Sequence, residues 1–154
     1  MWIQRALNSE LTITPFMKTI MVFGTFDFLH LGHLDLFKQA KALGDKLIVV
    51  ISRDSNVERI KGKAPFFTQG ERQKLVAGLK PVDLAVLGHE DDFYTAIKQF
   101  KPDVIALGYD QTTLPEEAIK AKLKSLGLKT KIVRLKPFSH SKHKSSAVKN
   151  FYSV

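Results

Sequence analysis

The chain has no cysteine among its 154 residues. This absence excludes a disulfide framework, a zinc–thiolate site, an iron–sulfur cluster and a cysteine nucleophile, so any protein ligand to a metal must be an oxygen or an imidazole. No apolar run approaches the ~18 residues of a membrane span. Residues 1–16 also lack the continuous apolar segment of a secretory signal. We therefore expect a cytoplasmic protein that does not insert into a membrane.

Acidic residues are missing from the last quarter of the chain. The sequence has 24 Lys and Arg against 15 Asp and Glu, and residues 118–154 hold ten of the basic residues and none of the acids. This asymmetry indicates a polyanionic partner: a nucleic acid, a membrane surface or a phosphorylated small molecule. A solvated lysine-rich surface is the alternative explanation.

Short apolar runs alternate along the chain with segments of helical periodicity. Strands are expected at residues 19–23, 46–52, 82–87, 103–107 and 130–135. Helices are expected at residues 32–43, 69–79, 91–100 and 114–126, with a short one capped by Asp54 or Ser55 and another beginning near Ser145. The alternation predicts an α/β fold, a doubly wound parallel five-stranded sheet of the Rossmann-like kind. Ligands of such folds bind outside the carboxyl ends of the strands, so residues 24–33, 108–113 and 136–146 should converge on one cleft.

The segment Gly24–His33, GTFDFLHLGH, joins the first expected strand to the first helix. Gly24 allows a close turn under a ligand, and a helix start presents unpaired N–H groups to an anion. His30 and His33 are three residues apart, so their rings lie on neighbouring faces of one turn. Two such imidazoles can donate hydrogen bonds to a phosphate or bind a metal. Histidines satisfied within the surface or core are the alternative.

Two later segments carry further polar side chains. In GYDQTT, Asp110 is placed to accept hydrogen bonds from ribose hydroxyls, although an Asx turn before the next helix fits equally well. The basic segment 139–146 places Ser145 and Ser146 at a helix start beside Lys142 and Lys144, where they would hold phosphates or simply face solvent.

Three basic residues in the middle of the chain are additional candidates for neutralising phosphate. Lys61 and Lys63 lie in an expected loop, residues 61–68, and Arg72 lies in the helix that follows it. Mobile surface lysines are the alternative for either lysine.

The GTFDFLHLGH segment resembles the H-x-G-H signature of cytidylyltransferase-like nucleotidyltransferases. The resemblance spans residues 24–148, so we expect a nucleotidyltransferase domain at 17–154 and an extension of unknown role at 1–16. It implies that His30 and His33 contact nucleotide phosphates and stabilise the pentavalent transition state at the α-phosphorus. The implied nucleotide-binding residues are Gly24, Thr25, Phe26, Gly32, Asp110, Gln111, Ser145 and Ser146.

Within this family, GYDQTT followed by glutamates looks like the archaeal-type FAD synthases, and Gln111 is the residue that favours them. The Ser145–Ser146 pair, with Ser139 where many members have an arginine, points the same way. This resemblance implies transfer of AMP from ATP to the phosphate of FMN, giving FAD and pyrophosphate without a covalent intermediate. It also implies Mg²⁺ bound mainly through the triphosphate, with unknown protein ligands, and a homodimer as is common in the family.

Two alternatives remain open at this point. The same residues would serve a glycerol-3-phosphate cytidylyltransferase or a related enzyme acting on a small phosphorylated alcohol. A nucleic-acid-binding α/β module would use the basic tail on a phosphate backbone, but the chain shows no interleaving of basic and aromatic residues typical of an RNA-binding sheet. We therefore expect no nucleic-acid partner.

Overall fold

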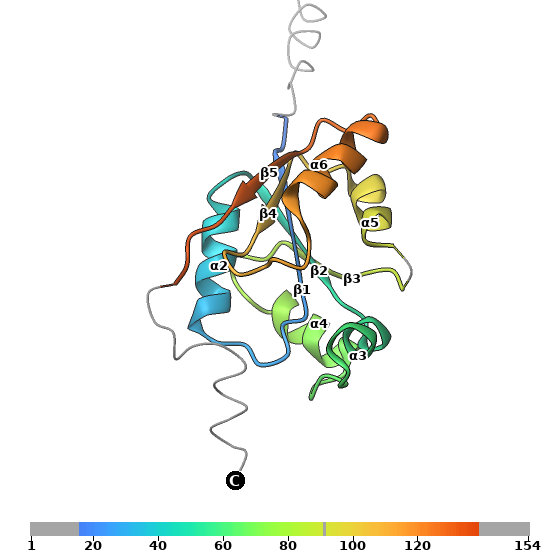
Figure 1. The fold of residues 1–154 in the computed structure, drawn as a ribbon. Coiled ribbons are helices and arrows are strands. Elements are labelled where there is room, and N and C mark those ends of the chain that lie inside the picture. Colours follow the sequence, from blue (N-terminus) through green and yellow to red (C-terminus); the bar gives the residue numbers. More distant parts are fainter. Residues whose placement is uncertain (1–15, 91, 139–154) are drawn as a thin grey trace, which may run out of the picture.

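The computed structural model describes residues 16–90 and 92–138. Within these residues, five parallel strands form one sheet in the order β3-β2-β1-β4-β5, with helices on both faces (Figure 1). The strands are β1 (Thr19–Gly24), β2 (Lys46–Ile51), β3 (Leu84–Leu87), β4 (Val104–Leu107) and β5 (Lys131–Arg134). The doubly wound parallel sheet expected from the sequence is confirmed.

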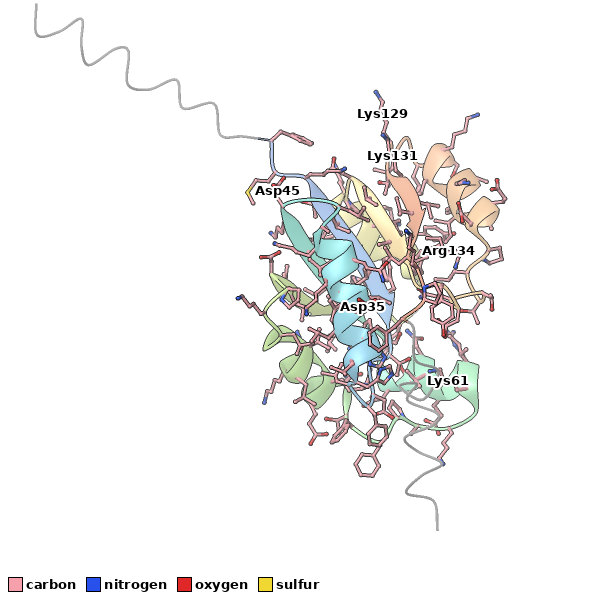
Figure 2. All side chains as sticks on the ribbon, turned by 90° about the vertical axis from the view of Figure 1, so that its left-hand side faces the viewer. Asp35, Asp45, Lys61, Lys129, Lys131 and Arg134 are labelled. Atoms are coloured by element: carbon pink, nitrogen blue, oxygen red, sulfur yellow. The ribbon has the colours of Figure 1, made fainter. Side chains whose placement is uncertain are left out.

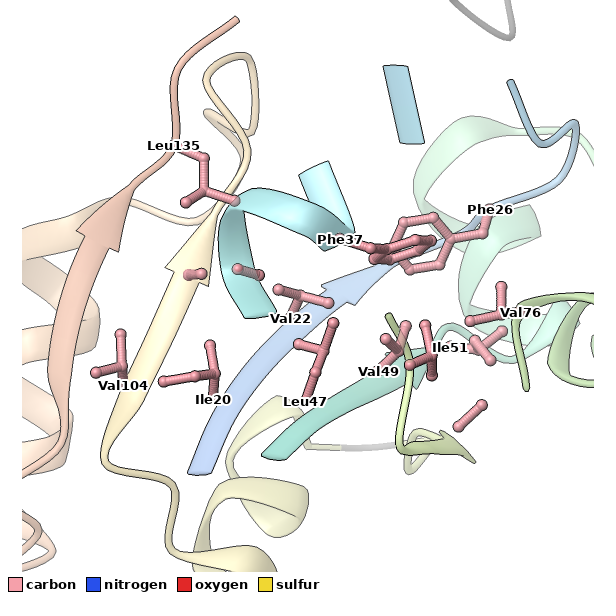
Figure 3. Packing of buried hydrophobic residues seen from close by; sticks show 14 residues of the cluster. Ile20, Val22, Phe26, Phe37, Leu47, Val49, Ile51, Val76, Val104 and Leu135 are labelled. Carbon is pink, nitrogen blue, oxygen red and sulfur yellow. The ribbon is translucent and has the colours of Figure 1, made fainter. Parts of the chain in front are cut away.

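Five helices accompany the sheet in the described part of the chain. They are α2 (Leu31–Lys41), α3 (Asp54–Lys61), α4 (Gln69–Ala77), α5 (Phe93–Phe100) and α6 (Glu116–Ser125). On one face, α2 and α4 pack against alternate side chains of the central strands, as Figure 3 shows for the cluster around Val22, Phe37 and Val49. On the other face, α5 and α6 bury the intervening side chains such as Met21 and Ile105. This two-sided burial explains why the central strands are apolar at successive positions.

Helices α3 and α6 begin or end at other residues than the sequence predicts. Asp54 does not cap α3 but is its first residue, because its carboxylate accepts hydrogen bonds from Arg72 and from the backbone N–H of Gln69. The same helix extends to Lys61, which therefore closes a helix instead of lying in a loop. Pro115 stands just before α6, so that helix begins at Glu116, two residues later than expected. The helix expected from Ser145 lies outside the described residues.

The carboxyl ends of the strands meet at one edge of the sheet. There the side-chain amide of Gln111 donates to the carbonyl of Phe23, at the end of β1 (3.2 Å), and Arg134, at the end of β5, donates to the carbonyl of Gly108 (2.9 Å). Gln39 of α2 exchanges two hydrogen bonds with the backbone of Lys136. These contacts join the ends of β1, β4 and β5, and the single cleft expected between residues 24–33, 108–113 and 136–146 stays a prediction. None of the helices built from the described residues is long and apolar enough to cross a membrane.

Candidate active site

The turn after β1 is shaped by Phe26. Its backbone has a φ of 53°, in the left-handed region, and its side chain is 6% exposed. The ring packs on Phe37 and edge-on to His33, at centroid distances of 5.0 and 5.5 Å. A Cβ on Gly24 would lie 2.6 Å from this ring, so only glycine fits there. The side chain of Phe26 therefore packs into the core, and any contact it makes with a nucleotide must come from its backbone.

His30 and His33 form a closed pair at the start of α2. His30 is the N-cap residue, and its Nδ1 accepts the backbone N–H of Gly32 at 3.1 Å. The Nδ1 of His33 accepts the backbone N–H of His30 at 3.3 Å, and the two rings stack at a centroid distance of 3.8 Å. Because each Nδ1 is an acceptor, each neutral ring carries its proton on Nε2. Gly32, which the family resemblance implies to bind nucleotide, uses its backbone N–H within the pair.

The electrostatics of His33 favour a neutral imidazole. Its pKa is lowered from 6.5 to about 4: burial is the largest cause, the charge of His30 adds to it, and a hydrogen bond with the backbone of Phe28 opposes both. At neutral pH, His33 is therefore an uncharged ring whose Nε2–H can donate a hydrogen bond without requiring a proton from solution.

Lys61 supplies positive charge beside the turn after β1. Its Nζ lies 3.2 Å from the hydroxyl oxygen of Thr25, to which it donates a hydrogen bond. Figure 2 shows Lys61 on α3 at the same end of the molecule as the first turn of α2. The structure thus brings Lys61 and Thr25 together with the histidine segment, while Lys63 lies exposed beyond the end of α3.

Arg72 does not face the site, contrary to the sequence-based expectation. Its side chain is fully buried and makes an ion pair of 2.6 Å with Asp54. It also donates to the backbone carbonyls of Thr25 (2.7 Å) and Phe67 (3.1 Å). These contacts satisfy the guanidinium from three directions, so Arg72 ties the turn after β1 to α3 and to the segment before α4 and cannot meet a phosphate.

Sequence reasoning overlooked Asp27, which lies inside the motif. Its side chain is buried, and its two carboxylate oxygens accept the backbone N–H groups of Phe66 (2.8 Å) and Phe67 (2.9 Å). Asp27 therefore fixes the segment before α4 against the turn after β1. The signal that could have revealed it is an acid within the apolar run TFDFL, since a buried carboxylate requires partners.

The loop after β4 is held by Gln111. Its side-chain oxygen accepts the backbone N–H of Gly108 at 3.3 Å, while its side-chain nitrogen donates to Phe23. The amide of Gln111 thus joins the ends of β4 and β1, which makes it a positioning residue for Asp110. Asp110 itself is exposed on this loop. One of its carboxylate oxygens lies 3.7 Å from the place that a Cβ on Gly108 would occupy.

Other candidate residues lie beyond the part of the chain that can be placed. Ser145, Ser146, Lys142 and Lys144 all fall outside the described residues, as does Ser139. Among residues 16–90 and 92–138, no three His, Asp or Glu side chains gather closely enough to hold a metal ion. The described site therefore offers the N–H donors of two imidazole rings and one ammonium group, which suit the oxygens of phosphate esters.

Comparison with known proteins places this geometry in a family. The family model described as cytidylyltransferase-like matches residues 21–151. A protein named FAD synthase from Thermoplasma acidophilum is 44% identical over 133 residues, which cover 86% of this chain and 92% of that protein. The protein of the same name from Aciduliprofundum boonei is 46% identical over 125 residues, covering 81% and 83%.

A solved structure shares both fold and sequence with this chain. It is described as a lipopolysaccharide core biosynthesis protein from Thermoplasma volcanium, and it matches with a TM-score of 0.76 and 45% identity. The match covers 80% of this chain and 99% of that structure. The likeness therefore extends over nearly the whole of the solved chain.

Proposed function

The chain belongs to the cytidylyltransferase-like family and is a nucleotidyltransferase, and we propose that it is an FAD synthase, which transfers AMP from ATP to the phosphate of FMN. The observation that carries the reaction class is the stacked pair of histidines at the start of α2, which follows the turn that Lys61 contacts through Thr25. The acceptor is supported by the relatives named FAD synthase, which match most of the chain at 43–46% identity.

The reaction needs charge stabilisation and positioning more than covalent chemistry. A phosphate oxygen of FMN attacks the α-phosphorus of ATP, the new P–O bond forms in line with the breaking bond to the β-phosphate bridge oxygen, and pyrophosphate leaves. The Nε2–H of His33, with its neighbour His30, donates to the α-phosphate oxygens as their charge rises. The ammonium of Lys61 lies beside the same turn and neutralises a phosphate of either substrate.

The remaining contacts to ATP extend the proposal to the sequence-based candidates. Asp110 accepts hydrogen bonds from the ribose hydroxyls, and Gln111 keeps its loop against the end of β1. Ser145, Ser146, Lys142 and Lys144 bind the outer phosphates, and Lys63 adds charge nearby. Each of these assignments supports the same orientation of ATP, with the triphosphate along the carboxyl edge of the sheet.

Nucleotidyltransferases of this kind use a divalent metal, and we propose Mg²⁺ bound mainly through the triphosphate. The residues fit such an ion, because Mg²⁺ usually keeps its waters and binds through substrate phosphates with few protein ligands. When bound, it withdraws charge from the phosphate oxygens. We also propose a cytoplasmic enzyme whose active domain is residues 17–154, acting as a homodimer.

An assay matrix tests the proposed function. The purified chain is incubated with Mg²⁺, with either ATP or CTP, and with FMN, glycerol 3-phosphate or a sugar 1-phosphate, and the products are separated by chromatography. FAD and pyrophosphate formed only from ATP and FMN support the proposal. A CDP-alcohol or a nucleotide sugar in place of FAD would overturn the choice of acceptor and keep the reaction class.

A further inference from the structure

Phe66 is an exposed aromatic residue whose backbone is fixed. Its side chain is 72% exposed, although its backbone N–H donates to the buried carboxylate of Asp27. The next residue, Phe67, is held by Asp27 through its N–H and by Arg72 through its carbonyl. The two backbone contacts of Asp27 hold this exposed ring in a fixed place, where a flat apolar ligand can cover it.

The ring of Phe66 belongs to a small aromatic cluster. It lies 5.2 Å from the ring of Phe28, with the planes tilted by 35°, and 5.0 Å edge-on from that of Phe67. Phe28 is itself 5.4 Å from Phe67. The rings of Phe28 and Phe67 therefore pack against the ring of Phe66, and the rest of the Phe66 ring is an aromatic surface exposed to solvent.

The cluster adjoins the phosphate-binding groups on a defined side. Phe28 is two residues before His30, and Lys61, five residues before Phe66, contacts Thr25. This is the β2 side of β1, because α3 and the segment to α4 follow β2. The loop that carries Asp110 follows β4, on the opposite side of β1. The loop on the β4 side thus carries the carboxylate of Asp110 beside the exposed Tyr109, whereas the β2 side carries the cluster of three phenylalanine rings.

Given the proposed function, we infer that Phe66, supported by Phe28, stacks against the isoalloxazine ring of FMN. Of the two substrates, FMN has the larger flat ring system, and most of its area is apolar. Its ribityl chain separates that ring from the phosphate, which lets the phosphate reach Lys61 and the histidines while the ring lies on Phe66. Adenine is then left to the β4 side, where Asp110 holds its ribose.

Four substitutions separate stacking from other effects. Phe66→Ala removes the ring, Phe66→Leu keeps an apolar side chain without an aromatic face, and Phe66→Trp keeps a face that quenches flavin fluorescence on contact. The matched control is Phe16→Ala, because Phe16 is also an exposed phenylalanine (82%) and precedes β1, whose amino end is the opposite edge of the sheet. The affinities for FMN and for ATP are measured separately by titration calorimetry, and FAD formation by chromatography.

We expect Phe66→Ala to weaken FMN binding about tenfold, the usual scale for a base stacked on an aromatic side chain, and to leave ATP binding unchanged. Phe66→Leu should lie between alanine and the natural protein, Phe66→Trp should bind FMN and quench its emission, and Phe16→Ala should match the natural protein. The inference would be overturned if Phe66→Ala binds FMN within twofold of the natural protein, or if it weakens ATP binding instead. Either result would leave the proposed function intact as long as the natural protein forms FAD. A natural chain that forms no FAD would overturn the proposed function, and this inference with it.

Discussion

The backbone N–H of His30 donates to Nδ1 of His33, while the two rings stack at 3.8 Å. The backbone of His30 thus fixes the tautomer of His33. This relationship makes Nε2–H the donor of the His33 ring, which also forms a hydrogen bond with the backbone of Phe28, and it holds a neutral His33 at a helix start. The catalytic account depends on that neutral donor.

Removing the ring of His33 should abolish most of the activity without unfolding the protein. We expect His33→Ala to lower kcat by roughly 10²–10³, the usual cost of losing one preorganised donor to a developing oxyanion. The rate of FAD formation at saturating substrates measures this, with circular dichroism as a check on folding. The control is His89→Ala, because His89 is exposed and lies outside the motif. Residual activity above a tenth of the natural rate would contradict the role of His33.

The lowered pKa of His33 predicts a loss of stability in mild acid. In the unfolded chain the ring takes up a proton below about pH 6.5, whereas in the folded protein it does so only near pH 4. The unfolded state therefore binds more protons as the pH falls through this window, and about 3 kcal/mol of stability is lost between these values. The ordinary pKa of aspartate lies below the window, and the pKa values of Asp83 and Asp92 are lowered further.

Denaturant melts at pH 7 and pH 4.5 measure this loss. In His33→Asn, whose side-chain oxygen can still accept the N–H of His30, the difference in unfolding free energy between the two pH values should shrink. His89→Ala should keep the natural difference. An equal acid sensitivity in His33→Asn and the natural protein would show that other groups cause it.

Asp110 should affect the nucleotide and not the flavin. We expect Asp110→Ala to raise the KM for ATP about tenfold, as the loss of a hydrogen bond to a charged group does, with little change in the KM for FMN. Steady-state kinetics with each substrate varied in turn give both constants. Glu90→Ala serves as the control, because Glu90 is an exposed acid outside this loop. An unchanged KM for ATP would remove the ribose assignment.

Arg72 should be a stability residue and not a phosphate ligand. Arg72→Met leaves the carboxylate of Asp54 and two backbone carbonyls without their donor, so we expect a loss of about 3 kcal/mol, the lower end for breaking a buried ion pair, because Asp54 is partly exposed. Chemical denaturation measures the loss. A variant that keeps its stability but loses affinity for ATP would restore the phosphate role expected from the sequence.

The fold could be predicted because apolar runs alternate with segments of helical periodicity, a pattern typical of a parallel sheet covered on both faces. The histidine pair could also be located, since it directly follows the first of these runs. The prediction for Arg72 was wrong because the sequence does not reveal that its side chain pairs with Asp54. Asp54 lies eighteen residues earlier, just after β2. Phe26 and Asp27 were hard to interpret for a related reason: their roles arise from a left-handed backbone turn and from a tertiary contact to residues 66–67.

One measurement tests the central claim most directly. The full chain is incubated with Mg²⁺, FMN and ATP labelled at the α-phosphate, and the label is followed in the free nucleotides and in the protein. The account predicts that the label moves from ATP into FAD with one pyrophosphate released per FAD, and that His33→Ala transfers almost none. Label bound covalently to the protein, or label that stays in ATP while FMN is present, would contradict it.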